Sequence, residues 1–96
     1  MAALEKAQVM ASLQKKGYRE EPGGRDHHYF VYYDGERKTC IRTKTSRSPK
    51  ARTLDSSLVQ KMATQCHLGK DEFLRLVRCP LTAEEYRLIL LQKKLL

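Results

Sequence analysis

A β-prone run with turn residues on both sides constrains the fold of this 96-residue chain more than any other feature. Residues 27–33 (His-His-Tyr-Phe-Val-Tyr-Tyr) are mostly aromatic or β-branched, which is typical of a strand. Pro22-Gly23-Gly24 forms a turn before the run, and Asp34-Gly35 after it is a hairpin signal. We therefore expect 27–33 to be the second of three antiparallel strands, with a short first strand at 18–21 and a third strand at 38–45.

Helical patterns flank these strands. Apolar residues recur at helical spacing over 3–16 (Ala3, Ala7, Met10, Leu13), and Gly17 ends the pattern. Further helices are expected over 55–67, with Leu58, Met62 and Cys66 on one stripe, over 70–78, and after Leu81, where the Thr82–Glu85 spacing fits a capping box. Residues 46–53 are polar, basic and interrupted by Pro49, so a loop is expected there.

This order predicts an α+β fold: α-β-β-β-α, a three-stranded antiparallel sheet with helices on one face, plus two extra C-terminal helices. We expect residues 1–68 to form the core and residues 69–96 to form a helical extension packed on the same domain. The other face of the sheet would be open to a partner.

The chain is strongly basic, with a formal net charge of +8. Residues 36–53 hold seven of the cations and one acid. A basic stripe is the usual electrostatic footprint of a nucleic-acid binder, although a solvated surface would have the same composition.

The remaining composition limits the other classes of function. The three cysteines are widely spaced, which favours neither a zinc site nor a disulfide framework, and Cys66 is expected in the core. We expect no cofactor, and no metal site, because Asp26 and Asp34 lie at opposite ends of the second strand. The cysteine usage fits a reducing cytoplasm best, so a cytoplasmic location is expected. No apolar run resembles a signal peptide or is long enough to span a bilayer.

Strand alternation assigns the side chains of the second and third strands to two faces. His28, Phe30 and Tyr32 share one face, and His27, Tyr29, Val31 and Tyr33 share the other. Ile41 lies opposite Arg42 and Lys44 on the third strand. With Phe30 and Ile41 in the core, the open face collects His27, Tyr29, Arg42 and Lys44.

That set of side chains suits RNA. Cations bind phosphate, an aromatic ring can stack on an unpaired base, and an imidazole can move a proton to or from a 2′-hydroxyl. Simpler interpretations apply as well: His27 as a hydrogen-bonding surface residue, the tyrosines as packing residues, His28 as a part-buried core residue and His67 as a helix-end residue.

The chain resembles the HicA toxin family. The resemblance covers roughly the first two-thirds of the chain and rests on Gly17-Tyr18, the Gly24-Arg25-Asp26-His27 step into a strand, the basic third strand and the helix that begins near Leu54. Gly24 and His27 match the glycine and histidine of the family's Gly-Ser-x-His motif. Arg25 stands where the motif has serine, so the hydroxyl of the motif is missing here.

The resemblance implies a fold like the double-stranded-RNA-binding domain and a metal-independent endoribonuclease that cleaves mRNA. It also implies neutralisation by a HicB-type antitoxin and a catalytic role for His27. The residues expected to bind RNA are Gly24, Arg25, Tyr29, Arg42, Lys44, Arg47 and Lys50.

Two other hypotheses stay open. A non-catalytic RNA-binding module would bind RNA in a salt-sensitive way and release no cleavage products. A protein-interaction domain would use its basic face to dock an acidic partner. Incubation with RNA in the absence of metal separates the first of these from the nuclease, and RNA-binding measurements separate the second.

Overall fold

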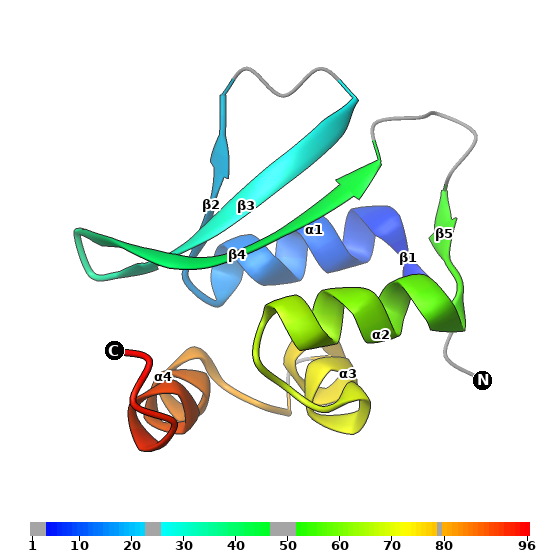
Figure 1. The fold of residues 1–96 in the computed structure, drawn as a ribbon. Helices are drawn as coiled ribbons and strands as arrows, with labels where there is room; N and C mark the ends of the chain where they lie inside the picture. Colours follow the sequence, from blue (N-terminus) through cyan, green and yellow to red (C-terminus); the bar gives the residue numbers. More distant parts are fainter. Residues whose placement is uncertain (1–3, 23–25, 47–51, 79) are drawn as a thin grey trace.

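The computed structural model describes residues 4–22, 26–46, 52–78 and 80–96, which form a three-stranded antiparallel sheet with four helices on one of its sides (Figure 1). The strand order is β2-β3-β4, with β3 in the centre. The strands are β2 (Tyr18–Glu21), β3 (His27–Asp34) and β4 (Arg37–Ser46). The helices are α1 (Lys6–Lys15), α2 (Ser56–Gln65), α3 (Lys70–Arg78) and α4 (Ala83–Gln92). The predicted fold class and element order are confirmed.

The hairpin between β3 and β4 forms where the Asp34-Gly35 signal predicted it. Asp34 pairs with Arg37, and Gly35 has φ of 64°, in the left-handed region that a tight hairpin turn favours. The pairing of β3 with β4 is irregular between Val31 and Tyr33. There the Thr39 hydroxyl donates to the Tyr32 carbonyl (2.6 Å) and accepts from the Ile41 amide (3.2 Å), which replaces hydrogen bonds that the irregularity interrupts.

The inner face of the sheet packs against the helices as alternation predicted. Phe30, Tyr32 and Ile41 are buried in the core. Two helix stripes differ from expectation. On α1 the buried side chains are Val9, Ser12 and Leu13, while Ala7 is exposed. On α2 they are Val59, Met62 and Ala63, and Leu58 is 42% exposed because it lies beyond the edge of the buried stripe.

The C-terminal helices are joined to this framework by buried polar residues of α1 and of its C-cap. Helix α3 packs against both α1 and α2, on the side away from the sheet (Figure 1). The Ser12 hydroxyl donates to the Val77 carbonyl (2.7 Å), and the ammonium of Lys16 donates to the Leu81 carbonyl (2.6 Å). These bonds satisfy carbonyls at and just beyond the C-terminal end of α3.

Helix α4 is anchored by a cluster of buried tyrosines. The Tyr86 hydroxyl donates to the Cys66 carbonyl (2.9 Å) and lies 2.6 Å from the Tyr18 hydroxyl on β2. The Tyr86 ring also meets the Tyr32 ring edge-on, with centroids 5.4 Å apart. Burial raises the pKa of Tyr18 and of Tyr86, and it raises the pKa of the Cys66 thiol to about 12. The two hydroxyls and the thiol therefore stay protonated well above neutral pH.

Helix ends follow local chemistry. The predicted capping box of Thr82 and Glu85 is present at the start of α4. Helix α2 is capped by Asp55 at its start. After its C-cap, Cys66, His67 has φ of 62° and the Leu68 amide donates to the Ala63 carbonyl (2.9 Å). This is a Schellman-type ending with histidine in the position that usually favours glycine.

One pairing is absent from the sequence-based prediction. The two-residue strands β1 (Leu4–Glu5) and β5 (Thr53–Leu54) form a small antiparallel sheet of their own. Leu4 faces Leu54, and both side chains are buried. Thr53, the last residue of the predicted loop at 46–53, therefore belongs to a strand. The pairing of β1 with β5 holds the start of α1 close to the start of α2.

Candidate nucleic-acid interface

The face of the sheet away from the helices, here called the outer face, carries cross-strand rows of polar side chains around β3. Tyr29 is flanked by Glu21 and Lys44, and Val31 by Arg19 and Arg42. His27 begins β3 on the same face, opposite Ser46. Alternation thus brings His27, Tyr29, Arg42 and Lys44 to one face, as predicted from the sequence.

Ion pairs cover the half of the outer face nearest the hairpin. The Arg19 guanidinium lies 4.2 Å from the centre of the Tyr33 ring and 3.6 Å from the Glu36 carboxylate. The Lys38 ammonium on β4 lies 2.9 Å from a Glu21 oxygen on β2, so this ion pair reaches across β3. This hydrogen bond is the main reason that the pKa of Lys38 is raised. Glu21 pairs with Tyr29 and Lys38 with Tyr33, so the ion pair crosses β3 at Val31, an apolar residue on the outer face that is only 1% exposed.

The other half has a different electrostatic character. We define the cationic corner as His27, Tyr29, Arg42 and Lys44, which lie on this half, together with Lys61 of α2, which lines a pocket with His27 and Lys44. Arg42, Lys44 and Lys61 are exposed and form no ion pair with any residue in the described ranges. The His27 and Tyr29 rings lie side by side, with centroids 6.0 Å apart. An imidazole and an aromatic ring therefore lie near cations that have no counter-charge among the described residues.

A pocket of about 240 Å³ opens beside His27, between the end of β4 and α2. Its apolar lining comes from Leu54, Leu58 and Met62. Its polar lining comes from Lys44, Thr45, Ser46, Lys61 and Gln65. A shallower hollow over Tyr29 and Arg42 shares Lys44 and Gln65 with this pocket, so the two form one continuous surface.

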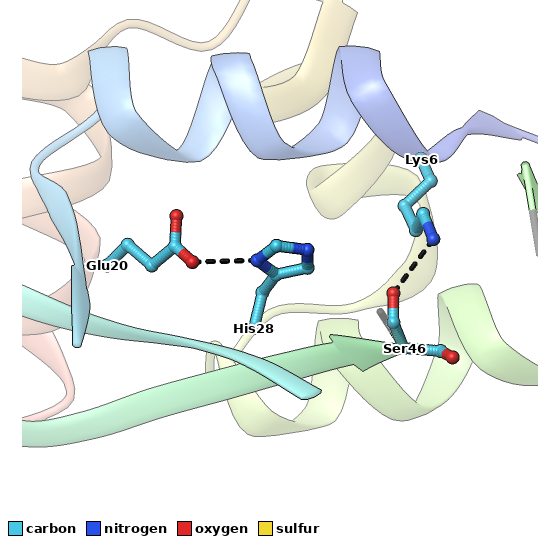
Figure 2. Close-up of polar contacts among 4 residues, drawn as sticks. All are labelled: Lys6, Glu20, His28 and Ser46. Carbon is cyan, nitrogen blue, oxygen red and sulfur yellow. Dashed lines mark hydrogen bonds and ion pairs between the residues drawn. The ribbon is translucent and has the colours of Figure 1, made fainter. Parts of the chain in front are cut away.

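The neighbouring histidine lies on the opposite face of the sheet. His28 Nδ1 is 2.7 Å from a Glu20 carboxylate oxygen, in the space between β3 and α1 (Figure 2). In the same view Lys6 of α1 donates to the Ser46 carbonyl at 2.8 Å. His28 is half-buried and held by a carboxylate, which agrees with the structural role predicted for it.

The structure describes only part of the predicted site. Gly24, Arg25, Arg47 and Lys50 lie outside the described residues. Sequence reasoning missed Lys61 and Gln65, which line the pocket from α2. A signal was present, because Leu58, Lys61, Met62 and Gln65 follow the i, i+3, i+4, i+7 spacing of one helix face. Their mixed polarity hid this face from a search for apolar stripes.

Comparison of the chain with models of protein families, with curated proteins and with solved structures finds no match. Within residues 4–22, 26–46, 52–78 and 80–96, no group of three or more His, Cys, Asp or Glu side chains is placed to hold a metal ion. None of the helices in these ranges combines the length and apolar character needed to cross a membrane.

Proposed function

We propose that the cationic corner binds RNA and that His27 transfers a proton while the RNA chain is cleaved through its own 2′-hydroxyl. The observation that carries the proposal is the position of His27. It lies beside Tyr29, at a pocket that Lys44 and Lys61 also line, on the one half of the outer face where the described cations have no acidic partner. Phosphate is the anion that such a surface fits best, and an aromatic ring next to it fits an unpaired base.

The chemistry requires two proton transfers. The 2′-oxygen attacks the adjacent phosphorus and loses its proton, the bond from phosphorus to the 5′-oxygen breaks, and the 5′-oxygen gains a proton. The products are a 2′,3′-cyclic phosphate and a 5′-hydroxyl, and no metal or oxidant takes part. His27 performs one transfer and solvent performs the other, while Lys44 and Lys61 stabilise the charge on the phosphoryl oxygens. One general acid or base contributes typically ~10²–10⁴-fold, so we expect a slow enzyme.

The resemblance to the HicA family supports the same assignment from a separate direction, through Gly24 and His27. On that basis we propose that the chain is an mRNA-cleaving toxin of the cytoplasm and that a HicB-type antitoxin neutralises it by covering the cationic corner. Arg25 stands where the motif has serine, two residues before His27 in the sequence, and the mechanism above uses no hydroxyl at that position.

The test compares the two adjacent histidines. Purified wild type, His27→Ala and His28→Ala are incubated with RNA in the presence of a metal chelator, and products are resolved by length and end group. We expect His27→Ala to lose at least ~10²-fold in cleavage rate while keeping its thermal stability. His28→Ala is the matched control: it leaves Glu20 without its imidazole partner and lowers stability, but it keeps cleavage.

Three outcomes contradict parts of the proposal. Full cleavage by His27→Ala would remove His27 from the mechanism. RNA binding that weakens with salt, without any cleavage product from the wild type, would support the non-catalytic RNA-binding hypothesis. Absence of RNA binding would favour a protein-interaction domain and would remove the proposed function altogether.

A further inference from the structure

We propose that the pocket between β4 and α2 holds one unpaired nucleobase, so that the ligand of the cationic corner is single-stranded RNA and not a duplex. This inference rests on the proposed function and names its substrate class. The pocket adds Lys61 and Gln65 of α2 to the residues of the sheet.

The size and lining of the pocket fit a base. Its volume of about 240 Å³ is below the range of about 300–1,000 Å³ typical of sites for drug-sized ligands, which suits a single flat ring system. Leu54, Leu58 and Met62 provide apolar surface for the faces of a ring, and the imidazole of His27 contributes to the same wall. In a duplex the faces of each base are covered by stacking, so only an unpaired base can enter such a pocket.

Polar groups that lack a protein partner lie at the same place. The Thr45 residue lines the pocket and is 4% exposed, and its hydroxyl has no hydrogen-bond partner among the described residues. The Gln65 side-chain oxygen accepts from the Thr43 hydroxyl (2.5 Å), which fixes the amide and leaves its NH₂ group without a partner in the described part of the chain. A hydroxyl and an amide NH₂ are the groups that read the edge of a base.

The cations around the pocket are placed to bind the phosphates on either side of that base. Lys44 and Lys61 line the pocket and bind the flanking phosphates. The adjoining hollow over Tyr29 and Arg42 continues from Lys44, so the neighbouring nucleotide has an aromatic ring to stack on and a cation for its phosphate. A base in the pocket therefore brings the linkage next to it alongside His27.

The experiment blocks the pocket without changing its charge. Binding is measured with 2′-O-methyl RNA, which cannot be cleaved through the 2′-oxygen, as a labelled single strand and as the duplex of the same sequence. Leu58→Trp fills the pocket mouth from an exposed position on α2, and Leu88→Trp, at a 52% exposed position on α4, is the matched control. We expect the wild type to prefer the single strand. We expect Leu58→Trp to lose about tenfold in single-strand affinity, and Leu88→Trp to lose none.

A second pair of variants tests the unpartnered hydroxyl. Thr45→Val replaces it with a methyl group of the same shape, and we expect thermal stability to be kept or raised. Single-strand affinity should fall several-fold, with an effect that differs between homopolymers of different base. Thr43→Val, which breaks the hydrogen bond to Gln65, should instead lower stability.

Failure of this inference is distinguishable from failure of the proposed function. Equal affinity for single strand and duplex, together with unchanged binding by Leu58→Trp, would overturn the base pocket, even if unmodified RNA is still cleaved in a His27-dependent way. Absence of binding to either probe by the wild type, together with absence of cleavage, would overturn both.

Discussion

The two ends of β3 have different surroundings. At the end of the strand, Asp34 accepts a hydrogen bond from Arg87 of α4 (2.8 Å), and the buried cluster of Tyr18, Tyr32 and Tyr86 lies beneath the same part of the sheet. At the start of the strand, His27 lines a pocket with Lys44 and Lys61, and these two lysines form no ion pair with any residue in the described ranges. The C-terminal helices therefore secure one end of the sheet and leave the other end accessible to a ligand.

This difference has an electrostatic cost. Exposed like charges such as Arg42, Lys44 and Lys61 repel one another, and the repulsion lowers stability until an anion binds. The hairpin end instead has buried tyrosine hydroxyls that bond to each other. These hydroxyls stay protonated well above neutral pH, because burial raises the pKa of both Tyr18 and Tyr86. Under the proposed function, stability and RNA binding depend on different ends of one strand, so substitutions at the two ends should have separable effects.

The largest expected effect is at the tyrosine cluster. Tyr86→Ala removes a fully buried ring and should cost about 3–5 kcal/mol in the free energy of unfolding, while Tyr86→Phe removes only the hydroxyl and should cost about 1–3 kcal/mol. Urea denaturation measures both. RNA affinity of the folded Tyr86→Phe protein should equal that of the wild type, and a loss of affinity would show that the two ends are coupled.

The next effect comes from two glycines at the hairpin end. Gly17 has φ of 109°, and a Cβ there would lie 2.8 Å from Cε1 of Tyr32. Gly17→Ala should therefore cost about 1–3 kcal/mol, because strain and overlap add. Gly35→Ala is the control: φ is 64°, but nothing lies within 4 Å of the added Cβ, so a cost of about 1 kcal/mol is expected from strain alone. Equal losses of thermal stability would refute the role of Tyr32.

A smaller effect separates paired from unpaired cations on the same face. Lys44→Gln removes an unpaired cation and should reduce the slope of log affinity against log salt for single-stranded RNA by about 0.7. Lys38→Gln removes a cation that is bound to Glu21 and should leave this slope unchanged. Binding titrations over a range of salt concentrations measure both slopes. A larger change for Lys38→Gln would place the RNA on the wrong half of the outer face.

The smallest effect is a pH dependence at the hairpin end. The hydrogen bond from Arg87 lowers the pKa of Asp34 below its ordinary value of 3.8. Because the folded-state pKa is the lower one, the stabilisation is present above the ordinary pKa and is lost as the pH falls through the folded value. Asp34→Asn should therefore flatten the fall in stability below about pH 4.

Glu85 acts in the same sense, because its bonds to Thr82 also lower its pKa. Glu85→Gln is accordingly a control that keeps the Asp34 contribution. Thermal melts over the acidic range compare the variants, and an Asp34→Asn curve parallel to that of the wild type would contradict the assignment.

Much of this architecture could be predicted from local patterns. The bounds of β2, the Asp34-Gly35 hairpin, the capping box at Thr82 and the assignment of His27 and His28 to opposite faces all follow from neighbouring residues. Two helix stripes were predicted wrongly at Ala7 and Leu58, which are exposed. Helical spacing alone does not say where the buried arc of a helix ends, because the neighbouring elements set that limit.

Local patterns were enough to give the order of the elements. Strand alternation, a local property of the backbone, was enough to give the two faces of the sheet and to gather His27, Tyr29, Arg42 and Lys44 on one of them. The pairing of the cations and the pocket that Lys61 and Gln65 close against β4 came instead from the packing of distant segments. So did the pairing of Leu4 with Leu54. These contacts join residues far apart in the chain, and their formation depends on how whole helices and sheets pack and not on the identity of adjacent residues.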